Sequence, residues 1–184
     1  MKSVAENKKK INLGEYIIYM YQMEDLIRSY SFNMDEIRQY VISHYPISEE
    51  EKTEVTLWFD ALISQMKHEH IQDRGHLSEV QDEVDILAKI HWEILKTDKD
   101  YFEIYHQAKP HILDFISSAE GQDLGHEIQI CLNGIYGLLL CRLTGKKVPE
   151  ELHKSAEAFG EVLGYLSLVY KERAGQQSTD HRPQ

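Results

Sequence analysis

The stretch EIQICLNGIYGLLLCRL, residues 127–143, decides the fold of this chain. Drawn as a helix, it carries apolar side chains around most of its circumference. A helix that is apolar on every side must be surrounded by other helices. Its apolar run, residues 128–143, is interrupted by polar residues and is shorter than the roughly 20 residues that a membrane span needs. We therefore predict a central core helix at residues 124–143.

Capping residues and stop signals recur on both sides of this helix at spacings of one helix length. Asn33 with Glu36, and Ser48 with Glu51, have the spacing of a capping box. Pro110 falls inside a helical pattern and predicts a kink there. The whole pattern predicts seven helices, at residues 12–30, 33–45, 48–75, 77–96, 98–121, 124–143 and 149–173.

The composition is that of one globular domain, with 184 residues of which 42% are hydrophobic and 28% charged. We find no internal repeat and no alternating β-branched run of strand length. The fold class is therefore predicted to be all-α, a single-domain bundle of about seven helices around residues 124–143. We expect a flexible N-terminus at residues 1–10, the helical domain at 11–174 and a disordered tail at 175–184.

Charge and cysteine content limit the partners and the compartment. Thirty-one acidic against twenty basic residues give a net charge of -11, which repels nucleic-acid phosphates and anionic lipid. We therefore expect no nucleic-acid and no membrane partner. Cys131 and Cys141 would lie about 15 Å apart on one helix, too far to form a disulfide with each other. With no apolar export signal near the N-terminus, we expect a cytoplasmic protein.

Motifs of the common enzymes are absent from the sequence: there is no phosphate-binding glycine loop, nucleophile elbow or zincin helix. The spacing Glu-x-x-His, used by dinuclear metal bundles, occurs at Glu103–His106 and at Glu150–His153. About one such pair is expected by chance, and neither lies on the main apolar face of its helix. We therefore expect no metal and no cofactor.

Two ionisable residues each lie at the centre of an otherwise apolar helix face: Glu24 and His91. Such side chains must be paired, hydrogen-bonded or neutral in a protein interior. Arg28 follows Glu24 at the spacing of an intrahelical pair. We hypothesise that the helices at 12–30 and 77–96 pack together, so that Glu24, Arg28 and His91 form one buried cluster. In the alternative, Glu24 and Arg28 pair at a groove edge and His91 bonds a backbone carbonyl.

If this cluster lined a pocket, His91 would be the group to titrate near neutrality and Glu24 would orient it. His70 and His76 are further candidates for the same cluster. A separate feature, the small residues Ala156, Gly160 and Gly164 at four-residue spacing, is interpreted as a packing strip rather than a binding motif.

Three segments carry a resemblance to a known family: YQMEDLIR at residues 21–28, Gly75–Leu77, and the stretch at 127–143. Together they resemble an uncharacterised domain-of-unknown-function family of small all-helical proteins from Bacteroidetes, over about residues 8–172. The resemblance implies a bacterial, cytoplasmic, single-domain helical protein. It implies no activity, so no catalytic residue is carried over.

From these features we expect a protein-interaction or scaffolding module that forms a homo-oligomer. The alternative is a helical small-ligand or metal-binding protein, which could be an enzyme, with a buried Glu/His/Arg cluster. Whether the chain is an enzyme stays open at this point.

Overall fold

The computed structural model describes the backbone of residues 1–179 and the side chains of residues 1–176. Within this range the chain is all-α, as the sequence predicts, with eight α-helices, one 3-10 helix and no strand. The helices are α1 (Lys2–Ile11), α2 (Leu13–Ser29), α3 (Met34–Tyr40), the 3-10 helix η1 (Ile42–His44), α4 (Glu49–His68), α5 (Ser78–Ile94), α6 (Lys99–Ser118), α7 (Glu127–Leu143) and α8 (Glu150–Thr179).

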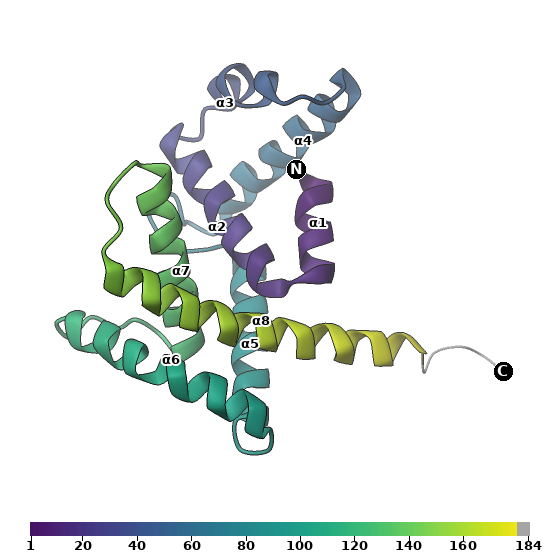
Figure 1. Ribbon diagram of the computed structural model, residues 1–184. Coiled ribbons are helices and arrows are strands. Elements are labelled where there is room, and N and C mark those ends of the chain that lie inside the picture. Colours follow the sequence, from purple (N-terminus) through teal and green to yellow (C-terminus); the bar gives the residue numbers. More distant parts are fainter. Residues whose placement is uncertain (180–184) are drawn as a thin grey trace.

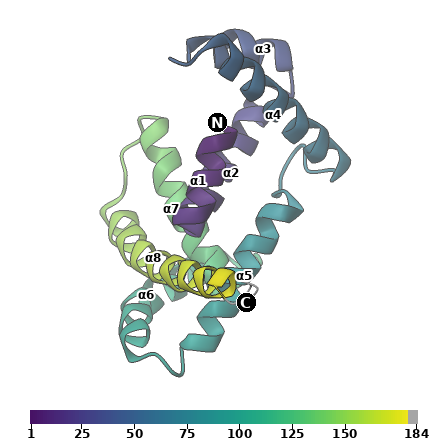
Figure 2. The same ribbon diagram turned by 90° about the vertical axis from the view of Figure 1, so that its right-hand side faces the viewer.

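The longest helix, α8, crosses the molecule and packs against α7, α6 and α5, and also against α2 and α1 (Figure 1). After a quarter turn, α3 and α4 lie at the end of the molecule away from α6 (Figure 2). Buried side chains from α1 through α8 join into one core. The fold is therefore a single bundle, in which α8 contacts helices from both ends of the chain.

Side-chain caps fix several helix starts where the sequence predicts them. Ser48 and Glu51 form a reciprocal capping box: the Ser48 N–H donates to the Glu51 carboxylate, and the Glu51 N–H donates to the Ser48 hydroxyl. Asn12 and Asp98 accept hydrogen bonds from the first turns of α2 and α6. The helix α6 continues on both sides of Pro110, and the expected kink stays a prediction.

Residues 1–10 are not the flexible segment that the sequence predicts, because Lys2–Ile11 form the helix α1. This helix packs against α2, buries Ala5, and places Lys9 Nζ 2.6 Å from Glu83 Oε1 of α5. Its polar composition hid the helix, which is held mainly by α2 and also by contacts with α4, α5 and α8. At the other end, α8 continues to Thr179 where a tail from 175 is predicted, and residues 180–184 lie outside the described part.

The helix predicted at 48–75 ends at His68 instead, and residues 69–77 form a linker to α5. His70 adopts a left-handed backbone with φ of 57°, and the Ile71 N–H donates to the Met66 carbonyl. This is the hydrogen bond that closes a helix whose last turn is followed by a left-handed residue. That position usually holds glycine, so the sequence did not reveal the helix end.

The predicted central helix, α7, is surrounded over its N-terminal half only. Ile128, Ile130, Cys131 and Leu132 are at most 1% exposed, and the Phe159 ring packs directly on the backbone at Gly134. In the C-terminal half, Leu140 is 37% and Leu143 is 67% exposed.

The strip of small residues on α8 is also only partly used for packing. Ala156 is buried, but no heavy atom lies within 4 Å of where a Cβ would stand at Gly160 or Gly164. The close approach of another backbone that a packing strip implies is not seen at these two glycines, which line an open cleft between α1, α2, α7 and α8.

Candidate functional site

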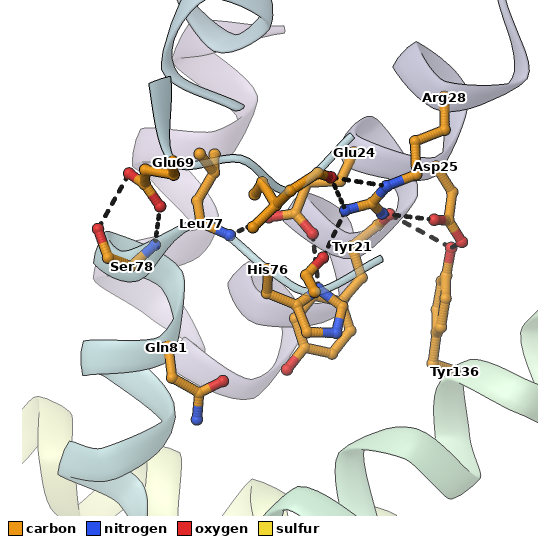
Figure 3. Close-up of polar contacts among 12 residues, drawn as sticks. Tyr21, Glu24, Asp25, Arg28, Glu69, His76, Leu77, Ser78, Gln81 and Tyr136 are labelled. Carbon is orange, nitrogen blue, oxygen red and sulfur yellow. Dashed lines mark hydrogen bonds and ion pairs between the residues drawn. The ribbon is translucent and has the colours of Figure 1, made fainter. Parts of the chain in front are cut away.

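A buried carboxylate on α2 holds the linker between α4 and α5 (Figure 3). Glu24 is 0% exposed, and its Oε2 lies 2.6 Å from His76 Nδ1. Its other oxygen, Oε1, accepts the Leu77 backbone N–H at 3.0 Å. Since an ionised carboxylate can only accept, His76 carries its proton on Nδ1 in this arrangement. The buried charge is thus paired and hydrogen-bonded, as a protein interior requires.

The His76 ring stacks on the ring of Tyr21 of α2. The two rings stack with centroids 3.5 Å apart and planes 17° apart. The Tyr21 hydroxyl accepts a hydrogen bond from Gln129 Nε2 of α7 at 3.0 Å. The side-chain oxygen of Gln129 in turn accepts a hydrogen bond from Gln81 Nε2 of α5 at 3.2 Å. Burial raises the pKa of Tyr21 to about 12. These contacts join α2, α5 and α7 around the linker.

Arg28 clamps the same linker from one turn further along α2. Its guanidinium donates to the carbonyls of Ile71, at 3.1 Å, and of Gly75. It pairs with Asp25 at 2.8 Å, and the Tyr136 hydroxyl of α7 donates to the same carboxylate at 2.6 Å. The pair between Glu24 and Arg28 that the spacing suggested is not formed, because each side chain reaches a different part of the linker (Figure 3).

His91 belongs to a second buried cluster. It is 1% exposed, and its Nδ1 lies 2.6 Å from the Tyr101 hydroxyl of α6. Its Nε2 lies 3.3 Å from Glu127 Oε2 of α7, and Glu127 also accepts from the Tyr105 hydroxyl at 3.0 Å. Burial lowers the pKa of His91, and the neighbouring Glu127 carboxylate opposes that shift. The partner of His91 is therefore a tyrosine hydroxyl, not the backbone carbonyl of the alternative.

The single cluster of Glu24, Arg28 and His91 does not exist, although α2 and α5 do pack together as expected. Glu24 meets His76 just before α5 begins, whereas His91 comes near the end of that helix. Thirteen residues of helix separate Ser78 from His91, which is roughly 20 Å at 1.5 Å per residue. Helical periodicity placed both side chains on inward faces but could not give their height along the bundle.

Of the other two histidine candidates, His76 joins the Glu24 cluster and His70 does not. His70 is exposed in the left-handed turn after α4. The paired residues Glu103 and His106 are exposed on α6, and in residues 1–179 no group of three or more His, Cys, Asp or Glu side chains could hold a metal ion. The partners that sequence reasoning missed are Tyr21, Asp25, Tyr101, Glu127 and Tyr136. Asp25 could have been found from its i,i+3 spacing to Arg28. Nothing in the sequence marks the other four, since each reaches a partner on another part of the chain.

Neither buried cluster opens into a described cleft. Glu24, His76 and His91 do not line any of five clefts found on the described part of the chain. His76 is partly accessible, with 27% of its side chain exposed, so solvent can reach this imidazole at the surface. The other polar groups of the first cluster form hydrogen bonds with one another and with the linker backbone. This arrangement fits a structural role, fixing the linker 69–77 onto α2.

The largest described cleft, about 860 Å³, lies between the C-terminal end of α6 and the first turns of α8. His111 Nδ1 lies there, 3.1 Å from the Ser155 hydroxyl. That hydroxyl donates its own proton to the Glu151 carbonyl at 2.8 Å, so it accepts from His111. A serine nucleophile needs the opposite direction, with its proton passing to the imidazole. The pair therefore is not arranged as an activated nucleophile.

No helix within the described residues is long and apolar enough to cross a membrane. No curated protein and no solved structure matches the chain. One family model does match, described as "Domain of unknown function (DUF4924)", and it covers residues 2–177. Because that match spans nearly the whole chain, from the start of α1 to two residues before the end of α8, the chain belongs to the DUF4924 family of uncharacterised proteins.

Proposed function

We propose that this chain is a non-catalytic protein-interaction or scaffolding module, and that copies of it associate into a homo-oligomer through the C-terminal half of α7. We call the exposed side of residues 135–143 the uncovered face of α7; Leu138, on the other side of the same segment, is buried. The observation that carries the proposal is the exposure of a helix that is apolar on all sides. Leu143 is 67% and Leu140 37% exposed, while Ile135, Tyr136 and Leu139 are half-buried.

A helix of this composition is stable in water when something covers it. Complete burial of one leucine side chain is worth about 1.5–3 kcal/mol, so covering the exposed parts of Leu140 and Leu143 would contribute a fraction of that value for each residue. Scattered exposed leucines need no explanation, but grouped ones on one helix end are typical of contact surfaces. The buried cluster around Glu24 supports the same reading, because Glu24 and Arg28 are bonded to His76 and to the linker backbone rather than turned toward a ligand.

The test is the mass of the protein in solution at micromolar concentration, by light scattering and by native mass spectrometry. We expect an oligomer for the natural sequence and a monomer for the double variant Leu140→Glu, Leu143→Glu. A natural protein that is monomeric throughout this range would refute self-association.

The matched control is Leu57→Glu. Leu57 lies on α4 and is 65% exposed, close to the value for Leu143. The same change of a leucine to a glutamate there should leave the mass unaltered. If Leu57→Glu dissociates the oligomer as well, added negative charge rather than the uncovered face explains the result.

A small-ligand-binding protein is the second candidate, favoured by the 860 Å³ cleft between α6 and α8. Clefts of about 300–1,000 Å³ are the usual size for small-molecule sites. His111 and Ser155 would supply its hydrogen-bonding groups and Phe115 an apolar wall. Native mass spectrometry of untagged protein tests this candidate: a retained small molecule that His111→Ala loses supports it, and protein free of any bound mass counts against it.

We further infer a cytoplasmic location in a bacterium of the Bacteroidetes. The likeness of residues 21–28 and 127–143 to proteins of that group supports the origin. Cys131 and Cys141 are both free thiols, which fits a reducing compartment. Localisation of the protein in fractionated cells of the source organism tests the inference, and recovery outside the cytoplasm would overturn it.

A further inference from the structure

We propose that the buried cluster of His91, Tyr101, Tyr105 and Glu127 is an acid-sensitive switch, which holds α6 on the bundle at neutral pH and lets it open when His91 takes up a second proton. We call these four residues the His91 switch. Opening involves one helix of one chain, so it requires neither self-association nor a bound ligand.

The Tyr101 hydroxyl fixes the proton on the neutral His91 ring. Tyr101 is 0% exposed, and the only partner of its hydroxyl among the described residues is His91 Nδ1, 2.6 Å away. A buried hydroxyl needs an acceptor for its proton, so Nδ1 accepts this hydrogen bond. The single proton of the neutral imidazole therefore lies on Nε2.

A second proton on His91 removes that acceptor. The proton must bind Nδ1, which then donates, and the Tyr101 hydroxyl is left with no acceptor for its own proton. On the other side of the ring, Nε2 lies 3.3 Å from Glu127 Oε2, but neither atom forms a hydrogen bond within the described residues. A charged ring that is 1% exposed would thus be poorly solvated, and it would leave a buried hydroxyl unpaired.

The other titratable groups around His91 do not reverse this preference. Burial is the largest cause of the lowered pKa of His91; the Glu127 carboxylate raises that pKa, and His126 lowers it. Tyr105 and Cys131 belong to the same surroundings, and burial raises the pKa of both, so they stay neutral near pH 6. The closed arrangement therefore favours the uncharged imidazole.

The helix whose release would expose His91 is α6. Its side chains Tyr101 and Tyr105 cover the imidazole, with ring centroids 5.7 and 5.1 Å from that of His91. The helix lies at one edge of the molecule and packs on α8 and α7 (Figure 1 and Figure 2). A cleft of about 860 Å³ lies at its C-terminal end and one of about 520 Å³ at its N-terminal end. Such a helix opens locally more easily than the elements at the centre of a core.

The contacts of α6 with α8 include one further histidine. His111 Nδ1 lies 3.1 Å from the Ser155 hydroxyl, so this pair needs a control of its own. At the other end, the Tyr165 hydroxyl donates to Asp98 at 2.7 Å. Hydrogen bonds from the Tyr101 N–H and from Tyr165 lower the pKa of Asp98, which therefore stays ionised near pH 6.

Hydrogen exchange measured by mass spectrometry between pH 7.5 and 5.5 tests the switch. Protection is the exchange rate of the unfolded chain divided by the observed rate, which removes the intrinsic effect of pH. In the open state His91 has its ordinary pKa of about 6.5, so α6 should lose protection below that pH, by at most about tenfold per pH unit. Protection of α2 should change much less. His91→Gln should abolish the fall in α6, and the control His111→Gln should keep it.

Two outcomes would overturn the switch: an equal fall in α2 and α6, which means unfolding of the whole chain, or a fall that His111→Gln abolishes and His91→Gln keeps. Glu127→Gln extends the test if His91→Gln does not fold. This variant removes the carboxylate that favours the charged imidazole, so it should enlarge the fall in α6. Protection of α6 that rises on acidification, and no longer does so in Glu127→Gln, would show an ion pair that tightens the cluster and would refute the switch.

Discussion

The two halves of α7 have similar composition and opposite surroundings. Residues 127–134 meet α5, α6 and α8, bury nearly every apolar side chain, and carry Glu127 into a polar cluster with His91. Residues 135–143 contact α2 through the Tyr136 hydroxyl and α8 through Arg142, bury Leu138, and leave Leu140 and Leu143 partly in water. The same kind of sequence is therefore core throughout one half and partly surface in the other.

This contrast teaches that hydrophobicity alone does not say which partner covers a helix. The first half is covered by this chain, and we propose that the second is covered by another copy. The same kind of substitution should therefore change stability by different amounts in the two halves. The difference between the two changes measures how differently the two halves are packed.

The largest difference is expected for leucine truncation. Leu132→Ala removes a fully buried side chain and should lower the free energy of unfolding by about 2–5 kcal/mol. Leu143→Ala removes an exposed one and should cost less than about 0.5 kcal/mol for the monomer. Urea unfolding at low protein concentration measures both. Similar costs at the two positions would mean that the C-terminal half is buried after all.

Next come the two glycines of the helix. A Cβ at Gly134 would stand 2.6 Å from the Phe159 ring, so Gly134→Ala forces a core rearrangement and should cost about 1–3 kcal/mol. Gly137→Ala meets open space and should stabilise the monomer by up to about 1 kcal/mol through helix propensity. Thermal unfolding of the two variants should shift the midpoint in opposite directions. Midpoints that shift in the same direction would contradict the proposed difference in packing around Gly134 and Gly137.

A smaller effect is expected where the second half is tied to α2. Tyr136→Phe deletes the hydroxyl that donates to Asp25 at 2.6 Å, and should cost about 1 kcal/mol. Asp25 keeps its contact with Arg28, so the linker should stay in place. Chemical-shift changes in an NMR spectrum should be confined to α2 and the second half of α7. Loss of signals from the linker 69–77 would show that this hydroxyl is also needed to keep Arg28 on the linker carbonyls.

The smallest expected effect is on the pH dependence of stability. It arises from His91 of α5, which contacts Glu127 in the first half of α7. Burial lowers the pKa of His91 in the folded state, while in the unfolded chain it is about 6.5. The unfolded state therefore takes up a proton that the folded state resists, so stability falls as the pH drops below about 6.5. His91→Gln should make the loss of stability between neutral and mildly acidic pH shallower. His68→Gln, at an exposed position of α4, is the control and should leave the slope unchanged.

Much of the fold was predictable because its signals are local. The capping box at Ser48 and Glu51, the start of α2 at Asn12, and the inward direction of Glu24 and His91 all depend on residues within one or two turns. The helix α1 and the end of α4 at His68 were not predictable. Both depend on distant contacts, such as Lys9 with Glu83 and Arg28 with the linker carbonyls.

The candidate site was likewise predictable in its local features and not in its long-range contacts. Periodicity identified the buried ionisable side chains, but not that Glu24 would meet His76, which lies 52 residues away. Helix periodicity fixes the angle of a side chain around its axis, and it contains no information on where two helices cross. By itself the sequence determined that this protein is helical and which faces turn inward. Only the tertiary structure decided that the first half of α7 is covered while Leu140 and Leu143 stay exposed, because crossing points are set by the packing of the whole chain.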